Sequence, residues 1–326
     1  MTEVKTLKDE GIRNEVREMA AAGMSSREIC HVLGWEGKKK STVGDLLRGD
    51  TYKQDDAQPT PTKEYTGPKI LTFDIETAPI LGAVWGLWQQ NVGLNMIQNE
   101  WYVLSWAAKW LHKNEVMYED KRESWNTSED VYLLQGIWKL LDEADIVITQ
   151  NGKKFDSKKL NARFIMHGMK PPSRYRHIDT LQEAKKHFAF TSNKLEWMTD
   201  KLCVKYKKLK HGNFAGYTLW EQCLKGNPAA WEEMEEYNRY DVLSLEELYG
   251  KMRPWMKGHL NLNIYDEGLE DKCTCGSTNW EHNGYAYTNL SKFDKFQCQD
   301  CGFEVRGRAN LLSKEKRETL KMNIQY

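Results

Sequence analysis

The sequence lacks long apolar runs and lacks an excess of charge of either sign. Lys plus Arg and Asp plus Glu each number 47, so the formal net charge is zero, and any surface that binds nucleic acid must be local. No apolar stretch approaches the roughly 20 residues that a membrane helix needs. Residues 1–11 carry charges where a signal peptide has an apolar segment. We therefore expect a cytoplasmic protein without a membrane partner.

Cysteine is scarce outside the C-terminal quarter, where four of the seven cysteines lie. This distribution argues against a secreted disulfide framework in a chain of 326 residues. Cys273 and Cys275 form one close pair, Cys298 and Cys301 form another, and residues 276–297 separate them. The pattern resembles a four-cysteine zinc ribbon, a small domain that needs its metal to fold. Its first pair is Cys-x-Cys where ribbons usually have Cys-x-x-Cys, which leaves His282 as a substitute ligand, and free structural thiols are the alternative.

Composition divides the chain into five segments. Residues 51–68 combine Pro, Thr, Gln and charged residues with almost no apolar side chain, which is typical of a linker. Between residues 69 and 257, apolar strand-like runs alternate with helical patterns, which indicates an α/β fold. We therefore expect a small helical domain at 1–50, a linker at 51–68, the main domain at 69–257, the zinc ribbon at 272–309 and a charged tail at 310–326.

The N-terminal segment has a helical pattern. Apolar residues recur at helical spacing over 12–19, and Ser25 and Glu28 have the spacing of a capping box that starts a second helix. Residues 41–49 predict a third helix. The arrangement resembles a helix-turn-helix of the resolvase or sigma-factor kind, with 38–42 at the start of the recognition helix. Acids and bases are balanced in this segment, so a protein-docking helical bundle is the alternative.

Residues 70–77, ILTFDIET, read as a strand with two acidic side chains on one face. Alternation places Leu71, Phe73 and Ile75 on one side, so Asp74 and Glu76 share the other. Two carboxylates this close repel each other. A divalent cation bound between them removes that repulsion.

Elements later in the chain carry further acids. A buried strand at 146–149 is followed by an Asn-Gly turn and by Asp156, which opens a helix and, taken alone, reads as an N-cap. Asp179 also reads as the N-cap of a following helix. A later helix at 229–252 places Tyr237 and Asp241 inside its apolar stripe. A carboxylate on the core side of a helix is costly unless it is paired or binds a metal.

Three motifs now stand in order along the chain: FDIET at 73–77, NGKKFD at 151–156 and YNRYD at 237–241. Over residues 69–257 this order resembles the DEDD superfamily of 3′→5′ exonucleases, in the subclass with tyrosine. Its members include the proofreading exonucleases of family B DNA polymerases and stand-alone, often phage-encoded relatives. The resemblance implies an α/β fold of the ribonuclease H-like kind, a mixed sheet flanked by helices, and the host cytoplasm as the location if a phage encodes the chain.

The resemblance also implies roles for individual residues. Two Mg²⁺ or Mn²⁺ ions would be held by four carboxylates, those of Asp74, Glu76, Asp156 and Asp241. Asp74 would bridge both ions, and the Tyr237 hydroxyl would orient the attacking water. The alternative for Tyr237 is an amphipathic core tyrosine. Asn151 and Phe155 would contact the terminal nucleotide.

Two stretches offer further contacts with nucleic acid. The loop at 201–212 is basic and could follow a phosphate backbone through Lys205, Lys207, Lys208 and Lys210, although a solvated charged surface is an equal alternative. Trp85 and Trp88, soon after the first acids, could stack on a base, whereas core packing is the commoner use of tryptophan.

We therefore expect a metal-dependent 3′→5′ exonuclease that acts on single-stranded 3′ ends of DNA in replication or repair, with a DNA polymerase or replication complex as a partner. An exoribonuclease is the first alternative, because the chemistry of such a site does not depend on the sugar. A non-enzymatic DNA-binding regulator is the second alternative.

Overall fold

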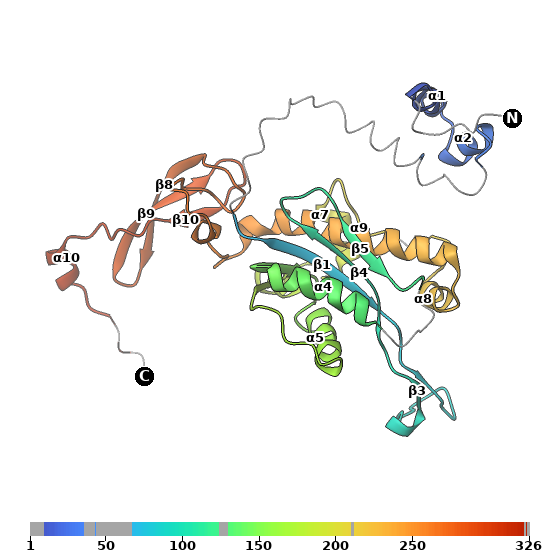
Figure 1. Ribbon diagram of the computed structural model, residues 1–326. Coiled ribbons are helices and arrows are strands. Elements are labelled where there is room, and N and C mark those ends of the chain that lie inside the picture. The colour runs from blue at the N-terminus through green and yellow to red at the C-terminus, as the bar shows by residue number, and fades with distance from the viewer. Residues whose placement is uncertain are drawn as a thin grey trace. The chain divides into compact units, whose positions relative to one another are not determined.

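The computed structural model describes residues 10–35, 43, 67–123, 130–209, 212–322 and 324 (Figure 1). The chain divides into two compact units, Met1–Glu64 and Tyr65–Tyr326. None of the helices in these described ranges combines the length and the apolar character needed to cross a membrane.

The first unit contains α1 (Glu10–Ala21) and α2 (Ser26–Val32). The backbone N–H of Glu28 donates to Ser25 Oγ, and the backbone N–H of Ser25 donates to Glu28 Oε2 at 2.7 Å. The predicted capping box is therefore confirmed. The third helix of the expected helix-turn-helix, with Lys38–Lys40, Ser41 and Thr42, lies outside the described residues apart from Val43, so the helix-turn-helix stays a prediction.

A five-stranded mixed sheet forms the centre of the second unit. Its strands in spatial order are β5 (Met117–Asp120), β4 (Val103–Trp110), β1 (Ile70–Thr77), β6 (Ile146–Thr149) and β7 (Arg176–Asp179). β4 is antiparallel to both of its neighbours, whereas β1, β6 and β7 are parallel. The predicted α/β fold with a ribonuclease H-like mixed sheet is confirmed.

Helices cover both faces of this sheet, as Figure 1 shows for α4 and α9. The helices on one face are α4 (Val131–Glu143) and α5 (Asp156–Met166); those on the other are α6 (Thr180–His187), α7 (Leu195–Leu202) and α9 (Pro228–Met252). α8 (Tyr217–Leu224) packs on the N-terminal part of α9. The predicted strand at 146–149 and the predicted helix at 229–252 are both present.

Alternation along β1 determines which side chains face which layer. Leu71 and Phe73 are fully buried against α4 and α5, and each contributes roughly 2 kcal/mol through its burial. Ile70 packs on the opposite face with residues of α9. Asp74 and Glu76 therefore lie on the α9 face, because they alternate with Phe73 and Ile75.

A hairpin extends from the sheet between β1 and β4. It contains β2 (Leu81–Gly82), the 3-10 turn η1 (Leu94–Met96) and β3 (Ile97–Asn99), and Figure 1 shows it, labelled at β3, extending away from the sheet and its helices. Trp85 is 97% exposed and Trp88 is 85% exposed. Core packing, the alternative for these two tryptophans, is therefore wrong.

The C-terminal part contains a small second sheet. After α9 come the 3-10 turns η2 (Arg253–Trp255) and η3 (Leu262–Tyr265), and then β8 (Trp280–Thr288), β9 (Ser291–Cys298) and β10 (Glu304–Arg306), which pair in the order β10-β9-β8. A short helix, α10 (Lys314–Glu318), follows. Few side chains of this sheet are buried, among them Phe293 and Cys298.

Candidate active site

Three acidic side chains meet between β1 and α9. Asp74 and Glu76 come from the end of β1, and Asp241 comes from the middle of α9. One carboxylate oxygen from each lies within 4.8 Å of the others. Asp74 and Glu76 keep partial contact with solvent, whereas Asp241 is 4% exposed. Residues far apart in the sequence thus place three of the four predicted acids together.

Asp156 approaches the same strand from the start of α5. It is the first residue of the helix rather than its N-cap, which is Phe155. Asp156 Oδ1 accepts a hydrogen bond from the Ile75 backbone N–H at 3.2 Å. The N-cap interpretation of Asp156 is therefore wrong. Asp156 lies close enough to Asp74 to raise the pKa of that carboxyl.

The carboxylates disfavour one another's charge. Burial, followed by the repulsion of the neighbouring acids, raises the pKa of Asp74 well above its ordinary value. Burial and Asp241 raise the pKa of Glu76 to about 8, and burial raises the pKa of Asp156 to about 7. A cation between these groups would restore their charged forms. An all-oxygen donor set of this kind fits Mg²⁺ or Mn²⁺.

A lysine supplies positive charge next to this cluster. Lys208 Nζ donates to Asp241 Oδ2 at 2.5 Å and lies 4.3 Å from the centre of the Tyr237 ring. Burial alone would lower the pKa of the Lys208 ammonium, yet the Asp241 carboxylate and the Tyr237 hydroxyl raise it above its ordinary value. The ammonium therefore stays charged. Sequence reasoning placed Lys208 among residues that follow a phosphate backbone, and the structure places its side chain against the acids.

The loop that carries Lys208 is fixed by a carboxylate of α9. Glu247 accepts hydrogen bonds from the backbone N–H groups of Val204 and Tyr206, each at 2.7 Å, and of Lys205 at 3.1 Å. Three donors on one carboxylate hold the loop at the helix. Lys207 instead contacts Asp200 at 3.3 Å, and Lys210 lies outside the described residues.

Tyr237 lies one helical turn before Asp241 on the same stripe of α9. It is 9% exposed, and its ring meets the Trp220 ring edge to face at 6.1 Å between centroids. Burial and the nearby Asp241 raise the pKa of its hydroxyl above the ordinary value. The hydroxyl therefore stays protonated at neutral pH and can both donate and accept a hydrogen bond.

Asn238 belongs to the site and was missed by sequence reasoning. It is fully buried, its Nδ2 donates to Asp74 Oδ2 at 2.8 Å, and its Oδ1 accepts from Ser105 Oγ at 3.2 Å. These two bonds fix the orientation of one carboxylate of the cluster. The sequence feature that could have identified Asn238 is its position three residues before Asp241, on the same side of the helix.

The Asn151 turn is built around Asp179. Asn151 has a positive φ of 66°, and a Cβ on the following Gly152 would lie 2.3 Å from Thr149 Oγ1, so the turn requires glycine there. Asp179 accepts from the backbone N–H of Asn151 at 2.9 Å and also caps α6 through the N–H of Leu181 at 3.1 Å. The predicted N-cap role of Asp179 is confirmed.

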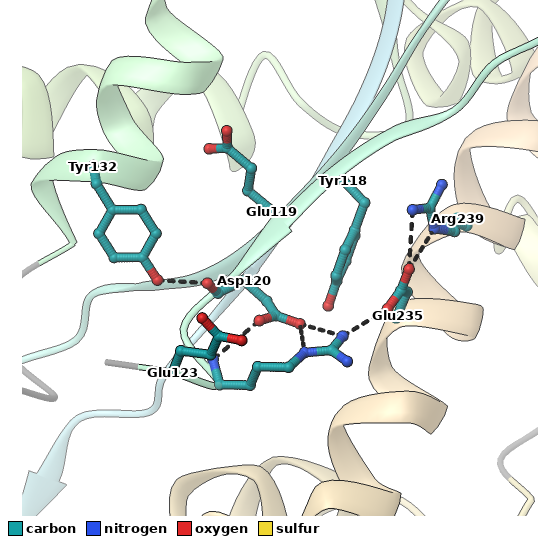
Figure 2. Close-up of a pocket in the computed structure, with 8 residues that line it drawn as sticks. Tyr118, Glu119, Asp120, Glu123, Tyr132, Glu235 and Arg239 are labelled. Carbon is teal, nitrogen blue, oxygen red and sulfur yellow. Dashed lines mark hydrogen bonds and ion pairs between the residues drawn. The ribbon is translucent and has the colours of Figure 1, made fainter. Parts of the chain in front are cut away.

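A polar cavity of about 670 Å³ lies elsewhere, at the edge strand β5 (Figure 2). Tyr132 reaches it from α4, and Glu235 and Arg239 reach it from α9. Arg122 pairs with both Asp120 and Glu235 at 2.6 Å. None of the predicted acids lines this cavity, and internal ion pairs satisfy its arginines.

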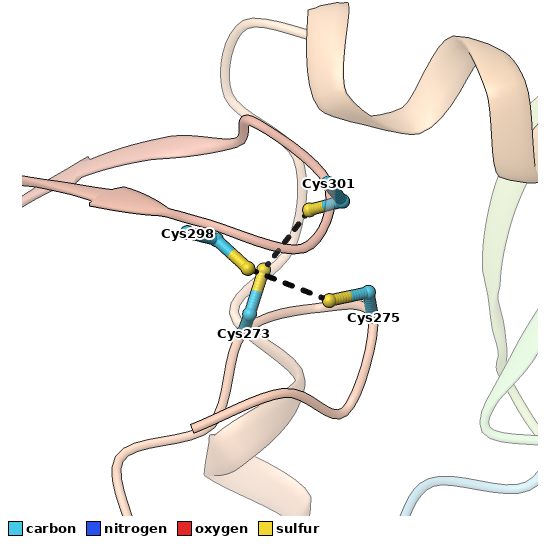
Figure 3. Close-up of side chains that lie close together, drawn as sticks. All are labelled: Cys273, Cys275, Cys298 and Cys301. Carbon is cyan, nitrogen blue, oxygen red and sulfur yellow. Dashed lines mark hydrogen bonds between the residues drawn. The ribbon is translucent and has the colours of Figure 1, made fainter. Parts of the chain in front are cut away.

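The four C-terminal cysteines form a compact cluster (Figure 3). All are free thiols, with Cys273 and Cys301 sulfurs 3.5 Å apart and Cys275 and Cys298 sulfurs 3.7 Å apart. Sulfurs around a tetrahedral zinc ion lie about 3.8 Å apart, given Zn–S bonds of about 2.3 Å. The donor set therefore fits zinc, including the Cys-x-Cys pair.

His282, the substitute ligand considered from the sequence, lies outside this cluster of cysteines. Its Nε2 is 3.1 Å from Asp294 Oδ1, and its ring contacts that of Phe296 edge to face.

Comparison with known proteins identifies the class of the main domain. Residues 92–253 match the family model of the RNase_H superfamily. Residues 92–253 therefore form an RNase H-like domain. The matched range includes Asp156, Tyr237 and Asp241 and begins after β1.

A solved structure of the family B DNA polymerase from the hyperthermophilic archaeon Pyrobaculum calidifontis is similar to this chain. The identity is 15% and the TM-score 0.44, and the alignment covers 65% of this chain and 28% of the polymerase. The chain thus spans well under a third of that protein. No curated protein matches the sequence.

Proposed function

We propose that the main domain is a metal-dependent 3′→5′ exonuclease that hydrolyses phosphodiester bonds at single-stranded 3′ ends of DNA. The observation that carries the proposal is the meeting of Asp74, Glu76 and Asp241 within 4.8 Å in an RNase H-like domain. Asp156 and Tyr237 lie beside this cluster, as the exonuclease motifs require. The activity belongs to DNA replication or repair, beside a DNA polymerase.

The carboxylates of Asp74, Glu76, Asp156 and Asp241 would hold two Mg²⁺ or Mn²⁺ ions. Bound divalent ions supply an activated water and stabilise the negative charge of the leaving oxygen. Asn238 holds the Asp74 carboxylate in one orientation through its amide. The Tyr237 hydroxyl, which stays protonated, orients the water for attack on the phosphorus.

The cysteine cluster has a separate, structural role in this proposal. Cys273, Cys275, Cys298 and Cys301 would hold one Zn²⁺, and their sulfur separations of 3.5 Å and 3.7 Å support a single tetrahedral ion. Zinc with four thiolates keeps no open position for a substrate. The ribbon therefore contributes stability rather than chemistry.

Digestion of end-labelled strands tests the proposed activity. The full chain is incubated with Mg²⁺ and with DNA or RNA labelled at the 5′ or the 3′ end. We expect 3′-labelled DNA to release labelled mononucleotide at once, and 5′-labelled DNA to shorten stepwise. Glu143→Gln, at an exposed acid paired with Lys69, is the matched control for Asp74→Asn.

Each other outcome of that digestion contradicts part of the proposal. Faster hydrolysis of RNA than of DNA would replace DNA with RNA as the substrate. Release from the 5′ end would contradict the polarity. If the parent and Asp74→Asn both bind DNA and neither hydrolyses it, the chain is a DNA-binding regulator.

A further inference from the structure

The hairpin at residues 80–99, called here the aromatic arm, is a folded element with an exposed surface. Leu81 pairs with Asn99, and the Ala83 backbone N–H donates to Met96 O at 2.9 Å. All residues of the aromatic arm are described, and none of them is buried. Its backbone is thus ordered by its own hydrogen bonds, while its side chains face solvent.

The aromatic arm combines strong apolar exposure with an absence of charge. Its most exposed large apolar residues are Trp85 (97%), Leu87 (90%), Leu94 (86%) and Trp88 (85%). No charged residue occurs between 77 and 99, although charged residues make up 29% of the chain. Contiguous exposed apolar surface of this kind marks a site of interaction. An uncharged arm neither repels phosphate groups nor attracts them.

The base of the aromatic arm lies at the acidic cluster. The arm begins four residues after Glu76 and returns into β4, where Val103 pairs with Thr77 of β1. At this base, Lys159 Nζ of α5 lies 3.6 Å from the centre of the Trp101 ring and 5.6 Å from that of Phe155. Phe155 is 40% exposed and directly precedes Asp156. Exposed aromatic rings and a cation thus connect the acids to the arm.

We propose that the aromatic arm binds unpaired bases of the polynucleotide substrate by stacking on Trp85 and Trp88, while Lys159 at its base contacts the phosphate backbone. The proposal rests on the proposed nuclease function. Tryptophan faces accept any base, because every base has a π-face. A substrate strand whose 3′ end occupies the acidic site would continue over Phe155 and Trp101 to the arm.

The test is binding of oligonucleotides to the zinc-containing full-length protein without Mg²⁺ or Mn²⁺, where no hydrolysis occurs. Fluorescence anisotropy compares the parent with Trp85→Ala/Trp88→Ala, using labelled oligothymidine of about 4 and of about 20 nucleotides. Because stacking contributes about 1–3 kcal/mol per base, affinity for the longer strand should fall at least about tenfold. Affinity for the shorter strand, which fills only the acidic site, should change little.

Two controls separate stacking from other causes. Trp255→Ala removes a tryptophan that is 69% exposed outside the arm, and it should leave both affinities unchanged. A longer strand with abasic sugars retains the phosphates but offers no bases, so the parent and the double variant should bind it equally. If the double variant loses as much affinity for the abasic strand as for the base-containing strand, the loss does not come from stacking and the proposal is overturned.

Two further results would also overturn the proposal. One is a double variant that binds the longer strand as tightly as the parent. The other is a parent that sediments as a dimer and a double variant that sediments as a monomer with unchanged DNA affinity, because the arm would then join two copies of this chain. Binding without Mg²⁺ or Mn²⁺ does not depend on catalysis, so a failure of the nuclease proposal alone would appear in the digestion assay instead.

Discussion

The acidic cluster and the cysteine cluster are both suited to a metal ion, but they depend on their surroundings in opposite ways. Asp74, Glu76 and Asp241 project from a five-stranded sheet and a 25-residue helix with large apolar cores on both faces. Cys298 ends β9 of a three-stranded sheet with few buried apolar side chains, and the other three cysteines lie outside its strands. The main domain should therefore fold without its ions, whereas the small sheet should need its zinc.

The chemistry of the ligands follows the same division. Burial and then mutual repulsion raise the pKa values of Asp74 and Glu76, so the domain tolerates the cluster at a cost in stability. The sheet beside the cysteines has few buried side chains, so a zinc ion bound by the cysteines would add to its stability. Loss of a ligand should stop catalysis in the first site and unfold the structure around the second.

The largest effect should follow loss of a cysteine ligand. Cys298→Ser should remove the zinc and unfold the sheet of β8, β9 and β10, since structural zinc contributes on the order of 10 kcal/mol to small domains. Zinc content and amide exchange of residues 273–306 measure this. Cys223→Ser, at a buried cysteine outside the cluster, is the control that should retain the metal. If the amides of this sheet stay fully protected from exchange in zinc-free Cys298→Ser protein, the sheet does not need zinc and the contrast between the two sites is wrong.

The next largest effect should be on catalysis. Asp74→Asn keeps the side-chain shape but removes a charge, so nucleotide release should fall by at least about a thousandfold. The free energy of unfolding without divalent ions should stay the same or rise, because repulsion within the cluster decreases. Single-turnover rates and urea unfolding measure the two quantities. Glu143→Gln should change neither, and substantial residual activity in Asp74→Asn would count against the proposed site.

His177 of β7 should contribute a loss of stability in acid. Burial lowers the pKa of His177 to about 4, and its Nε2 lies 2.7 Å from Thr149 Oγ1. The unfolded chain therefore takes up a proton at this histidine first, so the contribution of His177 to stability should fall by up to about 3 kcal/mol as the pH falls from about 6.5 toward 4. The raised pKa values of Asp74, Glu76 and Asp156 act in the opposite direction in the metal-free protein, because there the folded state takes up the protons first.

Urea unfolding of the parent and of His177→Gln from pH 7 to pH 4.5 measures this contribution as the difference between the two proteins. That difference should shift by about 2 kcal/mol in favour of the variant over this range, because glutamine does not titrate. A difference that does not change with pH would exclude a contribution of His177.

The smallest effect should come from the Tyr237 hydroxyl. Tyr237→Phe retains the ring contact with Trp220 but no longer orients water, so the single-turnover rate should fall about tenfold to a hundredfold. DNA affinity should stay unchanged. Tyr240→Phe, on the same helix with its ring against Tyr206, is the matched control. Equal rates for Tyr237→Phe and Tyr240→Phe would make Tyr237 a core tyrosine.

Periodic patterns made part of this structure predictable from the sequence. Alternation in β1 placed Phe73 in the core and Asp74 opposite, and the apolar stripe of α9 placed Asp241 on its buried side. The capping residues Ser25 and Asp179 were also predictable, because their bonds are local.

Contacts between distant elements were not predictable in the same way. The loop of Lys208 is directed by three bonds to Glu247, which lies about forty residues further along the chain. Asp156 at the start of α5 accepts a hydrogen bond from Ile75 of β1, a strand far away in the sequence. Trp85 and Trp88 carry no pattern that separates an exposed arm from a core, because apolar residues dominate both. Only the tertiary structure decides such cases.

A magnesium titration tests the central claim, that the acids of β1 and α9 bind catalytic divalent ions, most directly. Thermal unfolding and nucleotide release are followed over the same Mg²⁺ concentrations in the parent, Asp74→Asn and Glu143→Gln. An ion that binds only the folded state raises the unfolding temperature as it saturates its site. The parent and Glu143→Gln should gain stability and activity over one concentration range, and Asp74→Asn should gain neither. Activity of the parent in EDTA, or a parent-like response of Asp74→Asn to Mg²⁺, would contradict the claim.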